Sequence, residues 1–284
     1  MSNFKDIKEY DTIYVDGMNY CSIYYHAVPT MYKGHKTGML TGVTRLFTKC
    51  YRDYRGAKIV FLWEGESSLR KSKYPTYKAN RKDWRDDEEF FESLDYLKSE
   101  VLEHMGIDQR WCDGLEADDL AAFYAKDQIG YTLLISGDQD WCAYTSPSVD
   151  ILIKNTLTTY DDLKEKFGFD PNNLPLYKTI TGDSSDNVKG LYRFPKIVAV
   201  DLAKSVLDYK RCESILREWG KTREADLFRD NQDKLAENED LVYPFPVKGS
   251  DIVEVPGIFN LEALTVALER RGMEAAIEII SSWS

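Results

Sequence analysis

Short apolar runs alternate with helical stretches along the first half of the chain. The runs have the length and composition of β-strands and lie at residues 12–15, 59–63, 107–112, 132–135 and 149–153. Strands this apolar are buried on both faces, which is typical of a parallel sheet covered by helices. Apolar residues at helical spacing predict helices at residues 42–54, 86–101 and 115–126. The first half of the chain is therefore expected to form an α/β unit.

The pattern changes after about residue 154. Helical stretches, some of them separated by proline and glycine, predict five short helices at residues 160–167, 174–181, 196–207, 211–219 and 223–235. From residue 243 onward, Pro244, Pro246 and Pro256 precede two further helical runs. The second half is therefore predicted to be mostly helical.

Composition limits the class of protein. The chain has 284 residues, 43% of them hydrophobic and 30% charged, which suits a soluble globular protein with one substantial core, or with one core and a smaller helical lobe. No apolar run has the length of a membrane span, and residues 1–11 lack the apolar core of a signal peptide. The five cysteines have no metal-binding spacing, so reduced and mostly buried thiols are expected. These features predict a cytoplasmic protein that has no membrane partner.

The net charge of −11 conceals a local basic run. Residues 69–85 contain a single acid, Asp83, among the basic residues Arg70, Lys71, Lys73, Lys78, Arg81, Lys82 and Arg85. A local basic patch in an acidic protein is what contact with a polyanion requires. A solvated linker face is the alternative explanation for the run taken alone.

Four acids follow predicted strands: Asp16, Glu64, Asp138 and Asp140. Glu116 and Asp118 open a predicted helix, and Asp183 and Asp186 lie in a loop between helices further along the chain. Ligands of an open parallel sheet bind beyond the carboxyl ends of its strands, so these side chains are expected to converge. Converging carboxylates repel one another unless cations neutralise them, and an all-oxygen ligand set favours Mg²⁺ or Mn²⁺. Taken singly, Asp16 could belong to a turn and the acids at 116–119 could complement a helix dipole.

The ordered set of motifs resembles the 5′-nuclease family. That family contains flap endonucleases, the 5′-3′ exonuclease domain of bacterial DNA polymerase I, and free-standing phage enzymes. The matching segments appear in the family's order at residues 15–17, 74–81, 115–119, 135–140 and 181–187. Tyr-Lys-Ala-Asn-Arg at 77–81 and Gly-Asp-Ser-Ser-Asp-Asn at 182–187 are the most specific of them.

The resemblance implies a PIN-like three-layer α/β/α core with a mostly parallel central sheet, a helical arch and a lobe of helix-hairpin-helix type. The core would span residues 1–155, with the arch at about 69–103. The helical lobe would span residues 156–240, and residues 241–284 would pack back on the fold. With no polymerase domain attached, the chain looks like a phage-type enzyme located in the host-cell cytoplasm.

By the family pattern, two Mg²⁺ ions bind the acids, and Mn²⁺ can substitute. One ion would be held by Asp16, Glu64, Glu116 and Asp118, and the other by Asp138, Asp140, Asp183 and Asp186, with Asp119 assisting. Lys78 and Arg81 would act on the scissile phosphate, so the catalytic set comprises Asp16, Lys78, Arg81, Glu116 and Asp138. The implied DNA-contacting residues are Arg70, Lys71, Lys73, Tyr77, Lys78, Arg81, Lys82, Arg85, Lys189, Arg193 and Lys196.

Two departures from the family pattern stand out. Most relatives have Phe-Asp-Gly where this chain has Glu64 between Trp63 and Gly65, and glutamate can still ligate a metal. The glycines of the family's hairpin are replaced by the segment 193–196, Arg-Phe-Pro-Lys. Because those glycines shape a potassium site in several relatives, this departure puts both the duplex grip and any K⁺ in question.

The resemblance implies hydrolysis of phosphodiesters at or near the 5′ end of flap, nicked or RNA-primed DNA, with primer removal during replication as the role. The expected partners are DNA with a single-stranded 5′ end or an RNA–DNA hybrid, and replication proteins such as a single-strand-binding protein; the chain is expected to be a monomer. The alternatives are a PIN-type single-strand ribonuclease and a catalytically weak, structure-specific DNA-binding protein. A haloacid-dehalogenase phosphatase would need a second Asp at position 18, which is Met18.

Overall fold

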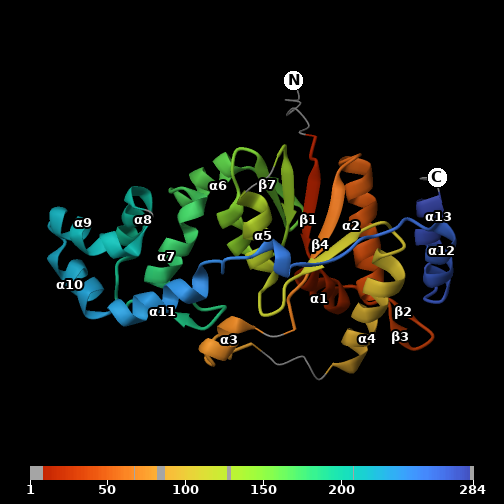
Figure 1. Ribbon diagram of the computed structural model, residues 1–284, viewed down its shortest axis with the longest axis horizontal. Helices are drawn as coiled ribbons and strands as arrows, with labels where there is room; N and C mark the ends of the chain where they lie inside the picture. Colours follow the sequence, from red (N-terminus) through yellow and green to blue (C-terminus); the bar gives the residue numbers. More distant parts are fainter. Residues whose placement is uncertain (1–8, 67, 82–86, 127–128, 207, 282–284) are drawn as a thin grey trace.

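A seven-stranded sheet forms the centre of the molecule (Figure 1). The computed structural model describes residues 9–66, 68–81, 87–126, 129–206 and 208–281. The strand order is β11-β5-β4-β1-β6-β7-β8, with the five inner strands parallel and the two edge strands antiparallel to their neighbours. The strands are β1 (Thr12–Asp16), β4 (Lys58–Leu62), β5 (Asp108–Trp111), β6 (Thr132–Ile135), β7 (Val149–Ile153), β8 (Thr156–Thr158) and β11 (Val253–Val255). All five predicted strands are confirmed, whereas the edge strands β8 and β11 were not predicted.

Alternate residues of the inner strands enter different hydrophobic clusters. In β1, Ile13 and Val15 pack with helices α1 (Gly17–Ala27) and α2 (Gly38–Asp53), whereas Tyr14 packs with α5 (Ala117–Lys126) on the opposite face. The central sheet is therefore covered on both faces, and the predicted α/β/α layering is confirmed.

The arch region and the short strands complete the first half. Its helical elements are α3 (Leu69–Lys73), α4 (Glu88–Tyr96) and η1 (Leu97–Leu102), the last with π-helical hydrogen bonding. Two short strands, β2 (Met31–Tyr32) and β3 (His35–Lys36), also lie in this half, whereas β9 (Gly182–Asp183) and β10 (Val188–Lys189) lie in the second. Helix α1 was not predicted, because the Asp-Gly pair at its start is more typical of a turn.

The second half is mostly helical, as predicted, and most of its helices pack around a hydrophobic cluster of their own, although Leu163 and Leu174 belong to a cluster of the central sheet. Its helices are α6 (Tyr160–Phe167), α7 (Leu174–Thr181), α8 (Lys196–Ser205), α9 (Cys212–Glu218), α10 (Thr222–Asp230) and α11 (Gln232–Val242), with short 3₁₀ turns η3 (Pro171–Asn173), η4 (Tyr209–Arg211) and η5 (Gly249–Asp251). A further 3₁₀ turn, η2 (Gln139–Tyr144), lies between β6 and β7 in the first half. The single helix predicted at 223–235 is wrong: the backbone leaves helical geometry at Asn231, with φ −127° and ψ 28°, and two helices result.

The end of the chain returns to the core. Strand β11 adds to the sheet beside β5, and helices α12 (Leu261–Glu269) and α13 (Glu274–Ser281) follow it. Tyr96 donates a hydrogen bond to the carbonyl oxygen of Ala267 at 2.7 Å, so α12 also holds the arch region. The three-part division of the chain itself stays a prediction.

All five cysteines are buried and free, as predicted. Among the described residues, no helix has both the length and the hydropathy that a membrane span needs.

Gly42 of helix α2 lies against Tyr24 of helix α1. A Cβ at this position would lie 2.0 Å from Cγ of Tyr24. Gly-to-Ala substitution in an exposed helix gains about 1 kcal/mol, but overpacking of a core costs about 1–3 kcal/mol. We therefore expect Gly42→Ala to lower the free energy of unfolding in urea denaturation. Arg45→Ala, at an exposed position of the same helix, is the control and should change stability by less than about 0.5 kcal/mol; a Gly42→Ala protein as stable as this control would contradict the close approach.

Candidate active site

Asp16 ends strand β1 and caps helix α1. Its carboxylate accepts hydrogen bonds from the Ser136 hydroxyl at 2.6 Å and from the Asn19 amide at 3.2 Å. Burial raises the pKa of Asp16 to about 7, although both hydrogen bonds lower it; the charges of Asp138 and Glu64 raise it further. Asp16 therefore lies at the carboxyl end of the sheet, within electrostatic reach of two other predicted ligands.

Glu116 and Asp118 stand at the N-terminus of α5. The Glu116 carboxylate accepts hydrogen bonds from Lys78 Nζ at 2.8 Å and from the Tyr77 hydroxyl at 3.1 Å. Burial would raise the pKa of Glu116, but the charges of Lys78 and Arg70 outweigh it and lower the pKa. Asp118 accepts a hydrogen bond from Trp141 Nε1 at 2.6 Å, and burial holds its pKa well above the usual range.

Asp140 and Asp183 lie around the ammonium group of Lys178, and Asp138 lines the same cleft. Asp138 caps the 3₁₀ turn η2 and accepts the Asp140 amide at 3.0 Å. Lys178, from α7, forms ion pairs with Asp140 and with Asp183. Burial raises the pKa of Asp140 to about 6 even though Lys178 opposes this. Asp183 also accepts the Ser185 amide at 2.8 Å.

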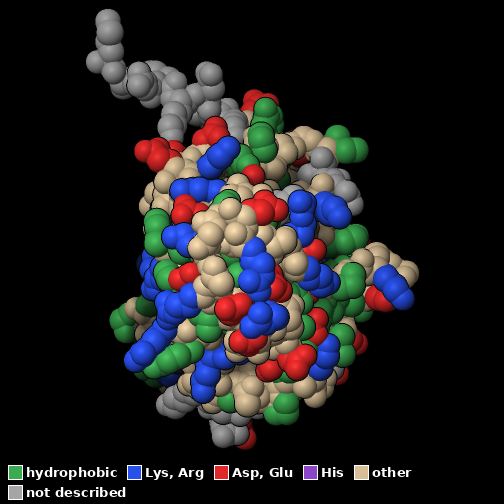
Figure 2. Space-filling model, turned by 90° about the vertical axis from the view of Figure 1, so that its left-hand side faces the viewer, with side chains coloured by type: hydrophobic (Ala, Val, Ile, Leu, Met, Phe, Trp, Pro, Cys, Tyr) green, Lys and Arg blue, Asp and Glu red, His purple; other side chains and the backbone are tan. Residues whose placement is uncertain are grey.

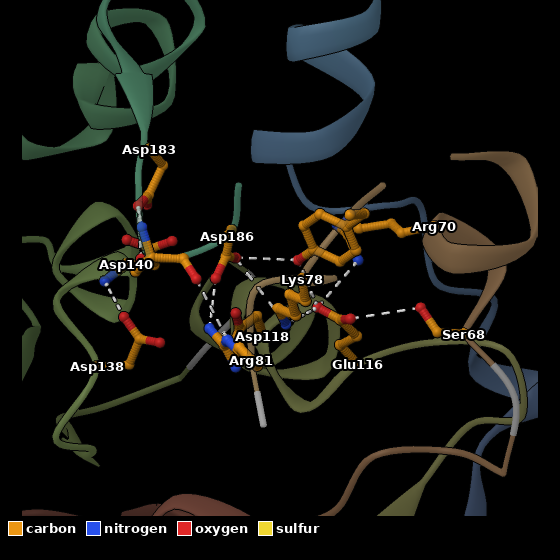
Figure 3. Close-up of polar contacts among 12 residues, drawn as sticks. Ser68, Arg70, Lys78, Arg81, Glu116, Asp118, Asp138, Asp140, Asp183 and Asp186 are labelled. Carbon is orange, nitrogen blue, oxygen red and sulfur yellow. Dashed lines mark hydrogen bonds and ion pairs between the residues drawn. The ribbon is translucent and has the colours of Figure 1, made fainter. Parts of the chain in front are cut away.

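The first leg of the arch, which comprises residues 69–81, is bound to the loop that carries Asp186. Arg81 pairs with the Asp186 carboxylate, and the Lys78 amide donates to the Asp186 carbonyl at 2.9 Å. Lys78 has the left-handed backbone angle φ 54°, an uncommon conformation that costs energy for a non-glycine residue. From this backbone conformation, the ammonium group of Lys78 points into the cluster of acids (Figure 3).

Two adjoining cavities gather these side chains. An open cleft of about 710 Å³ is lined by Arg81, Asp138, Asp140, Lys178 and Asp183. A narrow cavity beside it is lined by Glu116, Asp118, Asp140, Asp183 and Asp186. Asp140 and Asp183 belong to both, so acids from α5, η2 and the loop after α7 converge. Figure 3 shows Asp138, Asp140 and Asp183 at one end and Glu116 at the other.

The donor chemistry fits hard divalent cations. The converging groups are carboxylates, and burial raises the pKa of Asp16, Asp118 and Asp140. The ionised forms of such buried acids are stabilised by a nearby cation. In the described part of the chain, however, no three acids stand close enough to hold one ion together. Ammonium groups pair with several of these carboxylates instead, as Lys78 does with Glu116. The assignment of individual ligands therefore stays a prediction.

Three predicted site residues have other surroundings. Arg70 is 4% exposed and Tyr77 is 3% exposed, so neither side chain offers a surface to DNA, and those two predicted contacts are wrong. Tyr77 instead places its hydroxyl between Glu116 and Asp186, at 3.1 and 3.2 Å. Asp119 is fully buried and is paired with Arg70 at 2.7 Å, which removes it from the ligand set.

The other predicted DNA contacts stay predictions. Lys71, Lys73, Lys189, Arg193 and Lys196 are exposed, and Lys73 pairs with Asp240 of α11. Lys189 and Lys196 line one cleft of about 590 Å³. Lys82 and Arg85 lie outside the described residues. Figure 2 looks onto the helical lobe, where basic side chains are interspersed with acidic ones.

Lys178 was missed in the sequence. The feature that could have indicated its role is its position in the last turn of the helix that directly precedes the Gly-Asp-Ser-Ser-Asp-Asn motif. Glu64 follows strand β4 as predicted, and its side chain is exposed.

Comparison with known proteins gives concordant matches. Residues 11–168, more than half of the chain, match the family model described as 5′-3′ exonuclease, N-terminal resolvase-like domain. DNA polymerase I of Mycobacterium tuberculosis is 31% identical over 193 residues, and the 5′-3′ exonuclease of Aquifex aeolicus is 27% identical over 219 residues. The first match covers 64% of this chain but 21% of the polymerase, so the chain spans about a fifth of that relative's length; the second covers 74% of both proteins.

Solved structures share the fold. The T5 5′-exonuclease with bound zinc ions superposes with a TM-score of 0.66 at 20% identity, covering 95% of this chain and 96% of that one. The catalytic core of Rad2 in complex with DNA substrate gives a TM-score of 0.62 at 15% identity, covering 99% and 94%. At these identities the likeness concerns the fold.

Lys178→Met should make the stability of the protein depend on pH. Without the ammonium group, Asp140 and Asp183 repel each other, and their folded-state pKa values rise above the unfolded value of about 3.9. An acid whose folded pKa is raised destabilises the fold where it is ionised, so the loss should appear as pH rises through about 6, the pKa of Asp140 with the lysine present. Because Lys178 lowers the pKa of Asp183, that acid loses its partner at low pH as well. We therefore expect a loss of about 1–3 kcal/mol at pH 8 and a smaller loss at pH 4.5, measured by urea denaturation in chelator.

Lys164→Met, on the exposed side of α6, is the matched control and should show no such pH dependence. A Lys178→Met protein that is equally destabilised at both pH values would mean that the lysine acts through packing, not through its charge.

Proposed function

Because this chain belongs to the 5′-3′ exonuclease family, whose members are nucleases, we propose that it is a divalent-metal-dependent 5′-nuclease. It hydrolyses phosphodiesters at or near the 5′ end of flap, nicked or RNA-primed DNA. The observation that carries the proposal is the convergence of acids from separate segments beside Lys78 and Arg81. Primer removal during replication is the role proposed for this activity, in keeping with the DNA polymerase I relatives.

The carboxylates supply the positions for metal ions. Asp16, Glu64, Glu116 and Asp118 would hold one divalent ion, and Asp138, Asp140, Asp183 and Asp186 would hold the other. When bound, such ions lower the pKa of a water nucleophile and neutralise charge on the phosphate. Mg²⁺ is the proposed ion, because hard oxygen ligands without histidine or cysteine suit it.

Lys78 and Arg81 provide the cationic donors. The pKa of Lys78 is raised by Glu116, Asp186 and Asp118 despite burial, so its ammonium group is protonated at neutral pH. It can donate a hydrogen bond to a phosphate oxygen while it remains beside Glu116. The Arg81 side chain is 45% exposed, and it can turn from Asp186 toward a phosphate that enters the open cleft. Both residues therefore stabilise charge that develops on the phosphate during cleavage.

The arch provides the path for a single-stranded 5′ end. Its first leg is attached to the second half of the chain by hydrogen bonds from Asn80 to the Ser184 carbonyl at 2.9 Å and from Asn187 to the Thr76 carbonyl at 2.8 Å. A nucleic-acid strand that binds against this leg would contact the acids, Lys78 and Arg81 at the same time. This arrangement favours a 5′-nuclease over the smaller PIN-type ribonuclease, which lacks both the arch and the Asp183–Asp186 loop.

Asp138→Asn should abolish Mg²⁺-dependent cleavage of a labelled 5′-flap, by at least about 100-fold, while substrate affinity stays within about threefold. The substitution keeps size and hydrogen-bonding capacity but removes the charge that a metal requires. Asp95→Asn, on the exposed face of α4, serves as the control with wild-type rate. Wild-type cleavage by the Asp138→Asn protein would refute the proposed metal assignment. Running flap, nicked, RNA-primed and plain single strands in parallel identifies the preferred substrate.

Lys78→Met should lower kcat by about 100-fold or more and leave KM nearly unchanged, because the ammonium group acts on charge that develops in the transition state. Single-turnover cleavage of the same flap measures both. A rise in KM at constant kcat would instead make Lys78 an affinity contact for the DNA backbone.

A further inference from the structure

Arg70 belongs to the basic run of the arch, yet its side chain is enclosed by protein. Its guanidinium group donates two hydrogen bonds to Asp119, at 2.9 and 2.7 Å, and a third to the Tyr243 carbonyl at 2.8 Å. The group also lies over the Phe245 ring, 4.3 Å from its centroid. Arg70 therefore contacts helix α5 and the C-terminal segment from its place on α3.

Asp119 has no capacity left for a metal ion. Besides the two bonds from Arg70, its carboxylate accepts the backbone amides of Glu116 at 2.9 Å and of Phe245 at 2.7 Å. An ionised carboxylate has about four lone-pair sites, and four donors fill them here. The acid thus serves as the centre of a structural junction, which we call the Arg70–Asp119 clasp and which comprises Arg70, Asp119, Tyr243 and Phe245.

The clasp reaches the active site through Glu116. Asp119 fixes the Glu116 amide at the start of α5, while Arg70 Nη1 lies 3.8 Å from the Glu116 carboxylate. The same carboxylate accepts Lys78 Nζ at 2.8 Å. Both the main chain and the charge of Glu116 are therefore set by the clasp, and Glu116 in turn holds the ammonium group of Lys78.

We propose that Arg70 is a positioning residue for the nuclease reaction: through Asp119 it holds Glu116 and Lys78 in register, and it makes residues 243–245 part of the active-site support. The proposal rests on the proposed function. It assigns Asp119 a role in geometry, and it gives the C-terminal segment a role in catalysis although that segment contributes no acid to the cleft.

Kinetics of Arg70→Lys, Asp119→Asn and the double variant test the clasp. Lysine keeps the charge but cannot supply the planar set of donors. We expect each single variant to lower kcat on the 5′-flap by about tenfold or more with KM within about twofold, since small misplacements of catalytic groups are costly. The double variant should be no slower than the slower single one, because both substitutions break one unit.

Binding of Mn²⁺, measured by calorimetry without substrate, separates the clasp from a ligand role. A clasp predicts that the Mn²⁺ affinities of Arg70→Lys and Asp119→Asn agree within about threefold. Loss of Mn²⁺ binding in Asp119→Asn alone would make Asp119 a metal ligand and overturn the proposal. Wild-type kcat in Arg70→Lys, or multiplying effects in the double variant, would overturn it as well.

Arg110→Lys is the matched control. Arg110 also ties the C-terminal segment to the core, through Glu254 at 3.3 Å, and it stacks on Tyr124 at 4.9 Å. Equal loss of kcat in this variant would show that any weakening of the C-terminal segment lowers kcat, and it would refute a specific role for Arg70.

If Arg70→Lys fails to fold, Phe245→Leu removes only the stacking contact and should give a smaller fall in kcat at unchanged KM. If the wild-type protein cleaves no flap, the proposed function fails, while the Mn²⁺ comparison still decides the role of Asp119.

Discussion

Mutual repulsion among buried carboxylates is the constraint on which the rest of this structure depends. Acids from several segments that are distant in the sequence share two adjoining cavities, and burial together with neighbouring carboxylates raises the pKa of Asp16 to about 7 and that of Asp140 to about 6. Such a cluster is stable only where positive charge lies within it. Lys78, Arg81 and Lys178 supply that charge from three directions. The same cations tie the arch and the second half of the chain to the core, so charge balance and architecture have one origin.

The fold was readable because its strands obey simple rules. Strands β1, β4 and β6 are largely apolar runs, which only a sheet covered on both faces can bury, and acids follow where these strands end, whereas β5 is mostly polar. Helix boundaries were less accessible. The turn at Asn231 divides a stretch whose helical pattern runs on without proline or glycine, and α1 begins at a glycine that suggests a turn. Edge strand β11 was not predicted because its place is set by pairing with β5 and not by a local pattern. This partner lies 142 residues earlier, as the pairing of Val253 with Trp111 shows.

The acids of the candidate site could be predicted from the sequence, but the residues that support them could not. An acid at a strand end reveals its chemistry by position, so Asp16, Asp138 and Asp140 could be named from sequence. Whether a basic residue faces solvent or protein depends on packing between distant segments. Arg70 and Lys71 are neighbours in one basic run, yet one is buried against Asp119 and the other is exposed. Tyr77 bonds to Asp186, and Lys178 pairs with Asp140, only when the second half of the chain packs against the first.

The return of the chain at Tyr243 and Phe245 also bears on when the site is completed during synthesis. Arg70 and the carbonyl that it binds are 173 residues apart, and contacts this distant in sequence form late because a long loop must close first. A nascent chain that has emerged as far as α11 holds its acids and its arch but lacks the acceptor and the ring that enclose Arg70. The Arg70–Asp119 clasp can therefore close only after residue 245 has left the ribosome.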